Sequence, residues 1–245
     1  MHPARLRPAL TPWLRGLVAW PSVCAVCGGW PRAPVCPACV ARFAAPRARC
    51  DTCARPVPAE VVRCGACLHE PGPLDACVAA VDYAFPWDRL IARFKFRGEP
   101  GWADPLVLRL LEAPGAAALI AQADVIAPIP MLPARLAERG HHPAWELARR
   151  LAADRPRGTA QPEALVRLRD TPAQHRLDAG ARRLNLRGAF APHPSVAPHL
   201  VGRRVLLVDD VFTTGATLHT AAAALRQAGC AAVTALVLAR TPPPA

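Results

Sequence analysis

The stretch Val205 to Thr217 reads V-L-L-V-D-D-V-F-T-T-G-A-T, and it decides the fold. Four apolar residues, Val205 to Val208, predict a strand that is buried on both faces. Asp209 and Asp210 follow. Adjacent carboxylates repel each other, so both stay ionised only where a cation or hydroxyl groups lie next to them. The next residues are small and hydroxyl-rich and expose backbone N–H groups at a helix N-terminus, which suits a phosphate monoester. These residues are Thr213, Thr214, Gly215, Ala216 and Thr217. The stretch therefore offers acceptors for ribose hydroxyl groups beside a phosphate-binding loop.

Strand and helix patterns alternate along the chain on both sides of this stretch. Strands are expected at residues 76–85, 124–130, 165–168 and 231–238. Helices are expected at residues 87–96, 103–123 with an interruption at Pro114, 133–153 and 216–228, and an arginine-rich helix or loop at 172–186. Alternation of this kind predicts an α/β fold in which helices flank a parallel sheet. Such sheets bind their ligands at the carboxyl ends of the strands.

Eight of the ten cysteines form four C-x2-C pairs near the N-terminus. The pairs are Cys24/Cys27, Cys36/Cys39, Cys50/Cys53 and Cys64/Cys67. Two residues between cysteines allow both thiolates to reach one ion, and two such pairs complete a tetrahedral site. We expect two structural zinc ions, most simply one on the first four cysteines and one on the last four. Disulfides, an iron–sulfur centre and interleaved pairing are the alternatives. The other two cysteines, Cys77 and Cys230, are expected to be ordinary buried thiols.

Arginines interleave with these cysteines, and the whole chain has a formal net charge of +12. They are Arg32, Arg42, Arg47, Arg49, Arg55 and Arg63. With Trp30 and Phe43 they suit contacts with the backbone and bases of single-stranded DNA. A composition rich in Ala, Arg and Pro is the alternative explanation of the charge.

Composition narrows the class of protein further. Apolar residues make up 52% of the 245, which allows a sizeable core and argues against wholesale disorder. The 29 prolines exclude long uninterrupted helices. No apolar run approaches the roughly 18 residues of a membrane span. No export signal is recognisable at the N-terminus, so we expect a cytoplasmic protein.

The stretch Val205 to Thr217 resembles the phosphoribosyl pyrophosphate signature of type I phosphoribosyltransferases. Together with the cysteine pairs in front, residues 21–240 resemble the ComF family, in which a double zinc ribbon precedes a phosphoribosyltransferase domain. This family is named for competence and DNA uptake.

Three further segments resemble this family. Lys95, Phe96 and Gly98 are similar to an early Lys-aromatic-x-Gly segment. Residues 128–130, with Arg135, Arg139 and Gly140, are similar to the pyrophosphate-side loop and the helix start after it. The family usually continues with an aromatic residue, Asn and Gln, where this chain has His141, His142 and Pro143. Residues 171–190, which include Arg182 and Arg183, are similar to the mobile flap.

The resemblance implies a domain plan and a set of site residues. It implies an N-terminal helix or arm at 1–20, a double zinc ribbon at 21–70 and a type I phosphoribosyltransferase-like domain at 75–241. Asp209 and Asp210 would bind the ribose hydroxyls of phosphoribosyl pyrophosphate, and Thr213 to Thr217 its 5′-phosphate. A magnesium ion would bridge pyrophosphate and ribose oxygens. Pyrophosphate-side candidates are Arg135, Arg139, Arg182 and Arg183, and no catalytic residue is assigned.

Three functions are compatible with these features. The first is a phosphoribosyltransferase, hence a glycosyltransferase, with an unknown acceptor. The second is an accessory of the DNA-uptake machinery that binds single-stranded DNA without catalysis. The third is a sensor that binds phosphoribosyl pyrophosphate without turnover. Release of pyrophosphate in the presence of candidate acceptors separates the first function from the other two.

Overall fold

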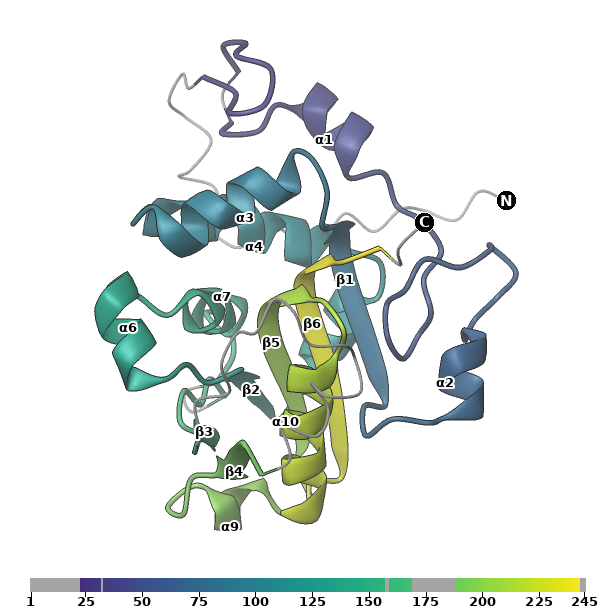
Figure 1. Ribbon diagram of the computed structural model, residues 1–245, viewed down its shortest axis with the longest axis vertical. Coiled ribbons are helices and arrows are strands. Elements are labelled where there is room, and N and C mark those ends of the chain that lie inside the picture. The colour runs from purple at the N-terminus through teal and green to yellow at the C-terminus, as the bar shows by residue number, and fades with distance from the viewer. Residues whose placement is uncertain (1–22, 32, 157–158, 169–187, 243–245) are drawn as a thin grey trace. The chain divides into compact units, whose positions relative to one another are not determined.

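Four parallel strands in the order β1-β6-β5-β2 form the central sheet (Figure 1). They are β1 (Ala76–Asp82), β2 (Val125–Pro128), β5 (Arg204–Phe212) and β6 (Ala232–Arg240). The computed structural model describes residues 23–31, 33–156, 159–168 and 188–242. These residues have the α/β architecture that the alternating patterns predict, with helices flanking a parallel sheet.

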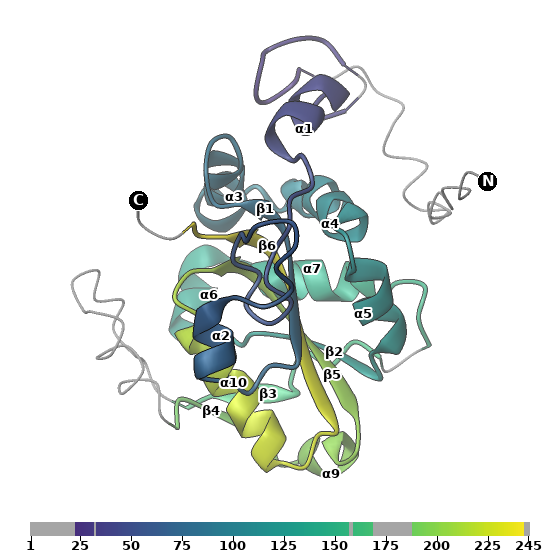
Figure 2. The same ribbon diagram turned by 90° about the vertical axis from the view of Figure 1, so that its right-hand side faces the viewer.

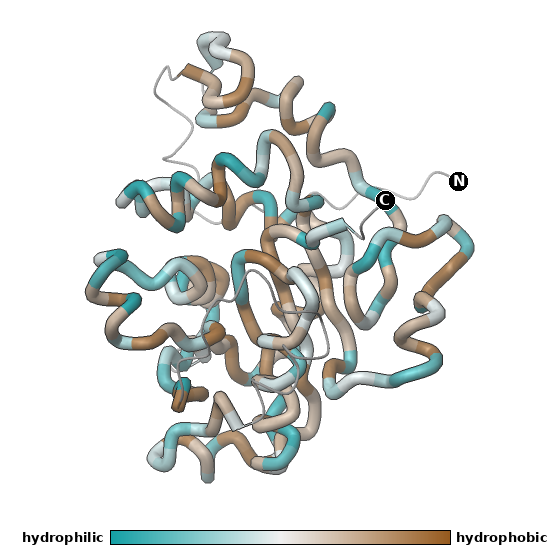
Figure 3. The backbone as a smooth tube through the Cα atoms, in the orientation of Figure 1, coloured by the Kyte–Doolittle hydropathy of each residue, from teal (hydrophilic) through white to brown (hydrophobic). Residues whose placement is uncertain are grey.

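Helices cover both faces of this sheet, and Figure 2 shows α5 and α10 on opposite sides of it. The helices before β2 are α3 (Trp87–Phe96), α4 (Ala103–Glu112) and α5 (Ala116–Gln122), with a short 3-10 helix, η2 (Pro100–Trp102), between α3 and α4. After β2 come α6 (Pro133–Arg139) and α7 (Pro143–Leu151), and α10 (Ala216–Gln227) joins β5 to β6. In Figure 3 apolar residues follow the central strands, whereas α3 alternates between polar and apolar residues. Leu90, Ile91 and Phe94 form the buried side of α3, as its spacing predicts.

A two-stranded antiparallel sheet and a short helix complete this part of the chain. Strand β3 (Leu165–Arg167) pairs with β4 (Phe190–Pro192), and α9 (Ala197–Leu200) precedes β5. The sequence patterns predict β3 but neither β4 nor α9, because each has only three or four residues and no clear period. The predicted segment 172–186, with Arg182 and Arg183, and the expected N-terminal arm at 1–20 lie outside the described residues.

The helix predicted at residues 133–153 is wrong in one respect, because it is two helices. Gly140 ends α6 with φ 76°, a left-handed conformation that stops a helix. Pro143 then begins α7, where its missing N–H group is not needed. The strand predicted at Val205 to Val208 is also longer than expected and continues through both acids to Phe212.

The chain divides into two compact units, Met1–Arg42 and Phe43–Ala245. The first unit contains the first two cysteine pairs and most of α1 (Pro37–Phe43). The second unit contains the other two pairs and α2 (Gly65–His69), in addition to the sheet. Cys50, Cys53 and Cys64 belong to the same buried cluster as Cys77 of β1 and Leu225 of α10. The second group of cysteines is therefore built into the core beside the sheet.

Within the described residues, no helix combines the length and the hydropathy that crossing a bilayer requires.

Candidate functional site

The two acids lie where β5 extends beyond its neighbour β2. Strand β2 pairs with β5 as far as Val208, whereas β6 accompanies β5 to Phe212. Asp209 and Asp210 are therefore at the carboxyl edge of the sheet, on a strand whose preceding four residues are fully buried. This is the edge at which open α/β sheets bind ligands.

Lys95 of α3 forms an ion pair with one of the two acids. Its Nζ donates to Oδ1 of Asp210 at 2.8 Å, and both side chains are largely buried. Burial opposes the charge of Lys95, but the Asp210 carboxylate outweighs this effect and raises the lysine pKa above its usual value. The cation that two adjacent carboxylates require is thus supplied by the only lysine of the chain.

Asp209 has an unusual protonation equilibrium. Removal of its carboxyl group from water, together with the neighbouring Asp210 charge, raises its pKa to about 8. Its Oδ1 also accepts the backbone N–H of Asp210 at 2.9 Å. A strongly shifted carboxyl group next to a specific charge partner is typical of functional sites.

The loop after β5 makes a tight turn into α10. Gly215 has φ 86°, and a Cβ atom added there would lie 2.4 Å from Cε2 of Phe212. Glycine is therefore required for both the backbone conformation and the space. Thr213 and Thr214 are exposed on this turn, and the N–H groups of the first helical turn lack intrahelical acceptors. Within the loop the Ala216 N–H donates to Oγ1 of Thr214 at 3.4 Å. Hydroxyl groups and N–H groups at a helix N-terminus are suited to a phosphate group.

Of the four pyrophosphate-side candidates, two lie on α6 and two lie outside the described residues. Arg139 ends α6, and its guanidinium lies 4.8 Å from the ring centre of Phe96, the residue next to Lys95. Arg135 is exposed on the same helix. Arg182 and Arg183 lie outside the described residues. The structure therefore brings Arg139 towards the Lys95–Asp210 pair, because Phe96 bridges the two elements.

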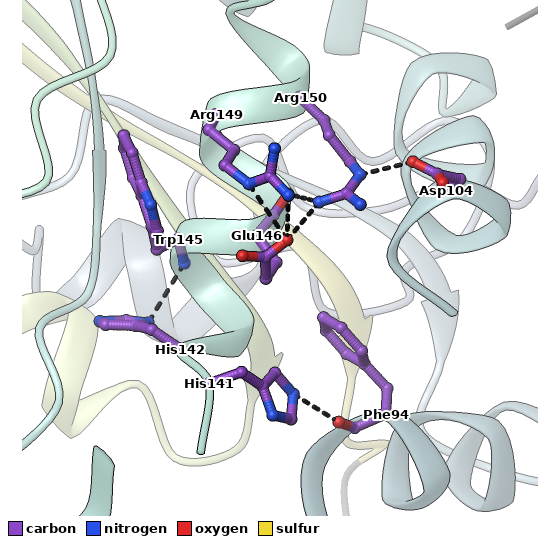
Figure 4. Close-up of polar contacts among 8 residues, drawn as sticks. All are labelled: Phe94, Asp104, His141, His142, Trp145, Glu146, Arg149 and Arg150. Atoms are coloured by element: carbon purple, nitrogen blue, oxygen red, sulfur yellow. Dashed lines mark hydrogen bonds and ion pairs between the residues drawn. The ribbon is translucent and has the colours of Figure 1, made fainter. Parts of the chain in front are cut away.

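The two histidines that replace the usual family pattern after Gly140 have structural partners (Figure 4). His141 Nε2 contacts the carbonyl oxygen of Phe94 at 2.8 Å, which joins this loop to α3. His142 Nδ1 accepts the backbone N–H of Trp145 at 3.2 Å and so caps α7. The His141 contact fixes the loop against the helix that carries Lys95, and the His142 contact fixes it to the start of α7.

The eight paired cysteines form two clusters in chain order. In each cluster all four sulfur atoms lie within 4.8 Å of one another. The Cys27 and Cys36 sulfurs are 3.8 Å apart, and those of Cys53 and Cys64 are 3.7 Å apart. Four thiolates at about 2.3 Å from one tetrahedral zinc ion lie about 3.8 Å from each other, so the spacing fits. It is also far longer than a disulfide bond, and the simpler sequential pairing is confirmed.

Backbone N–H groups donate to three of these sulfurs, of which that of Cys36 accepts from Cys39 at 3.4 Å. Cys36 donates to the sulfur of Cys24 at 3.3 Å, and Cys64 donates to that of Cys50 at 3.4 Å. Burial opposes ionisation of both thiols, but backbone hydrogen bonds outweigh it and lower the pKa of Cys24 to about 6 and that of Cys50 to about 7. Burial instead raises the pKa of Cys39 to about 12 and that of Cys53 to about 11, so each cluster has one thiol that ionises easily beside others that do not. Thiolates are the form in which cysteine binds a metal. Cys77 and Cys230 are buried outside the clusters, as predicted.

Two residues of the site have partners that sequence reasoning missed. The ion pair of Lys95 with Asp210 joins positions 115 residues apart. Arg240, at the end of β6, donates to the carbonyl oxygens of Phe212 and Thr213 at the start of the loop. An arginine directly after an apolar strand is the one sequence feature that could have indicated the second contact, and nothing in the local pattern identifies its acceptors.

Comparisons with known proteins agree with this geometry. A phosphoribosyl transferase domain model matches residues 137–243, which contain the acid pair and the loop. DNA utilization protein YhgH of Escherichia coli (strain K12) is 32% identical over 231 residues, which cover 90% of this chain and 98% of that protein. Competence protein F of Haemophilus influenzae is 33% identical over 199 residues, which cover 78% of this chain and 84% of that protein. With two four-cysteine clusters ahead of a phosphoribosyltransferase sheet, the chain belongs to the ComF family.

Proposed function

We propose that this protein binds phosphoribosyl pyrophosphate with magnesium through the carboxyl edge of β5, and that it acts in DNA uptake. The observation that carries the proposal is the Lys95–Asp210 ion pair beside Asp209, followed directly by the Gly215 turn into α10. This arrangement combines acceptors for hydroxyl groups with donors for a phosphate group, which a ribose 5-phosphate requires together.

Each part of the donor has a matching group in the proposed complex. Asp209 and Asp210 accept hydrogen bonds from the ribose hydroxyls, and the loop from Thr213 to Thr217 holds the 5′-phosphate. Arg135 and Arg139 serve the pyrophosphate side, with Arg182 and Arg183 of the segment whose sequence resembles the family's flap. The carboxylates are hard oxygen donors of the kind that magnesium prefers, so the site fits that ion when it arrives with the pyrophosphate.

The chemistry of such a site is displacement at the anomeric carbon. The bond from this carbon to pyrophosphate breaks, and the bond to an acceptor nucleophile forms. The chain's own contribution is to orient the donor and to neutralise charge, because the site consists of acids, cations and N–H groups. The acceptor is the open part of the proposal, and a sensor that binds the donor without turnover is the alternative.

Two measurements test donor binding and turnover. Phosphoribosyl pyrophosphate with magnesium should raise the melting temperature, since a ligand of the native state stabilises it by mass action. The double variant Asp209→Asn, Asp210→Asn should fold and lose this rise, and a rise of unchanged size would contradict the assignment. Pyrophosphate release during a screen of acceptors, DNA included, separates an enzyme from a sensor.

The relatives' names support the association with DNA, since they are called DNA utilization protein and Competence protein F. A second candidate function, non-catalytic binding of single-stranded DNA, is favoured by one further observation. Trp30 is 81% exposed in the first compact unit of a chain with a net charge of +12. Exposed aromatic rings with arginines nearby form platforms on which bases stack. Arg47, Arg49 and Arg63 are less suited to this role, because they pair with Asp82 and Asp51.

The DNA-binding function is tested by affinity for single-stranded DNA at several salt concentrations. Trp30→Ala should weaken binding by about 1–3 kcal/mol at every salt concentration, because it removes stacking and no charge. Leu68→Ala is the matched control, since Leu68 is 65% exposed but has no ring. Binding no stronger than that of an unrelated arginine-rich protein of equal charge would remove this function.

A further inference from the structure

Arg240 is a buried arginine whose hydrogen bonds reach two distant segments of the chain as well as its own neighbour. It is 5% exposed, and its Nε donates to the carbonyl oxygen of Cys53 at 2.9 Å. Its NH1 group donates to the carbonyl oxygens of Phe212, Thr213 and Thr241. The guanidinium carbon also lies 4.4 Å from the ring centre of Phe212. The five donors of arginine allow one side chain to make all these contacts.

The hydrogen bonds of Arg240 connect two parts of the chain that have different functions. Cys53 is a member of the second four-cysteine cluster, which fits a metal ion. Phe212 and Thr213 begin the loop that we assign to the 5′-phosphate. The ring of Phe212 fills the space next to Gly215, where a Cβ atom would lie 2.4 Å from it. The position of Phe212 therefore determines where the turn runs and where its N–H groups point.

Two other polar contacts of the chain around the second cluster reach the sheet rather than this loop, although Cys50, Cys53 and Cys64 share one buried apolar cluster with Phe212. Cys77 of β1 donates its N–H to the carbonyl oxygen of Asp51, and Arg49 pairs with Asp82 at the end of β1. Within the described residues, Arg240 is the side chain whose hydrogen bonds join this cluster to the loop. The first cluster belongs to the other compact unit, so it serves as an internal comparison.

We propose that Arg240 is a positioning residue that couples the second four-cysteine cluster to the phosphate loop, so that loss of metal from this cluster loosens the loop and weakens donor binding. The part of this inference that concerns the donor rests on the proposed function. The part that concerns the loop does not, because loop order is measured without ligand.

Hydrogen exchange tests the connection without any ligand. Cys67→Ser and Cys36→Ser each remove one half-buried ligand, from the second and the first cluster respectively. Metal analysis verifies that each variant has lost one ion. Amide exchange in the peptide 211–220 should become about tenfold faster in Cys67→Ser, a usual size for coupling between sites. It should be unchanged in Cys36→Ser. Unchanged exchange in both variants overturns the proposal.

Arg240→Lys tests the same connection with both clusters intact. Lysine keeps the charge, but it lacks the planar fork that reaches several carbonyl groups. This variant should keep its metal content and show the same faster exchange in 211–220. Adding Cys67→Ser to it should produce little further change, because the connection is already broken. A purely structural role for Arg240 would lower the melting temperature and leave exchange in 211–220 no faster than in the rest of the sheet, and this result also overturns the proposal.

Donor binding supplies the last measurement. The dissociation constant for phosphoribosyl pyrophosphate with magnesium should rise about tenfold in Cys67→Ser and in Arg240→Lys, but not in Cys36→Ser. By reciprocity, the donor should slow release of metal from the second cluster to a chelator by a similar factor. If the metal-loaded wild type does not bind the donor, the proposed function fails while the exchange experiment still decides the coupling. If the donor binds equally well to the wild type and to all variants, the proposed coupling to donor affinity is wrong and the proposed function stands.

Discussion

Asp209 keeps a proton in the folded protein over a pH range in which it is ionised in the unfolded chain. Its folded-state pKa is about 8, against a usual value of about 3.9. Between these two values the folded state binds more protons, so the stability contribution of this group falls as pH rises from about 4 to 8. The cause is burial of the carboxyl group next to Asp210, so the loss of folding stability at high pH arises from the position of Asp209 in the site.

Asp209→Asn should therefore stabilise the protein, and the gain should grow with pH. The gain should grow by up to about 1.4 kcal/mol per pH unit between the two pKa values, so it should be about three to four times larger at pH 8 than at pH 5, because the amide does not ionise. Urea unfolding at several pH values measures the difference. Asp154→Asn, at an exposed position, is the control and should change stability by less than about 0.5 kcal/mol. A gain for Asp209→Asn that does not vary with pH would contradict the raised pKa.

Gly215 is the second residue for which the structure makes a sharp prediction. Gly215→Ala should abolish the thermal shift caused by phosphoribosyl pyrophosphate, because the methyl group displaces Phe212 and changes the turn. Gly202→Ala is the matched control. Gly202 has φ 70°, but an added Cβ would meet nothing within 4 Å. The control should cost about 1 kcal/mol for the left-handed backbone alone and should retain the full ligand-induced shift.

Helices α4 and α7 are joined by an arginine that lies between two acids (Figure 4). Arg150 of α7 pairs with Asp104 of α4 and with Glu146 one turn earlier on its own helix. Its neighbour Arg149 also pairs with Glu146, but its side chain is 45% exposed, against 15% for Arg150. Solvent screens the exposed pair. The ion pairs of Arg150 should therefore contribute more to the free energy of unfolding than that of Arg149, although both arginines share Glu146 as a partner.

Arg150→Met should lower the free energy of unfolding by about 2–3 kcal/mol, since it leaves the partly buried Asp104 carboxylate without its cation and leaves Glu146 with only the exposed Arg149. Arg149→Met should cost less than about 0.5 kcal/mol. Denaturant unfolding of the two variants measures the difference, and equal losses would show that the α4–α7 contact does not depend on this ion pair. Both variants should keep the donor-induced thermal shift, because neither residue contacts β5 or its loop through a described hydrogen bond.

At the scale of the whole molecule, the two cysteine clusters should have unequal effects on stability. The purified protein should contain close to two zinc ions, because eight thiolates fill two closed sites. Cys24→Ser should remove one ion and leave the sheet folded, since Cys24 belongs to the separate unit Met1–Arg42. Cys50→Ser should remove the other ion and also lower the melting temperature of the sheet, because Cys50 lies in the core beside it.

Cys24 and Cys50 form a matched pair for this comparison, because each is 1% exposed. Zinc analysis and thermal unfolding followed at the sheet's far-ultraviolet signal supply the two readouts. Equal destabilisation by both variants would contradict the division into two units. Protein that contains disulfides in place of metal would contradict the assignment of both sites.

Local patterns were sufficient to predict most elements of this protein. The strand Val205 to Val208, the helix over residues 87–96 and the grouping of cysteines in chain order depend on neighbours within a few residues. The break at Gly140 and the length of β5 were missed, because helix and strand ends depend on caps and on the partner strand.

The sequence by itself determined the α/β class, the acid pair beside the hydroxyl-rich loop and the four C-x2-C pairs, because each is encoded in contiguous or regularly spaced residues. The structure grouped these pairs into two sets of four in chain order. Only the tertiary structure decided which cations serve the site. Lys95 reaches Asp210 from 115 positions away, and Arg240 reaches Cys53 from 187 positions away. Such contacts follow from how α3 and β6 pack around the sheet, and no short-range pattern specifies which of the chain's many arginines will be buried against a carbonyl group.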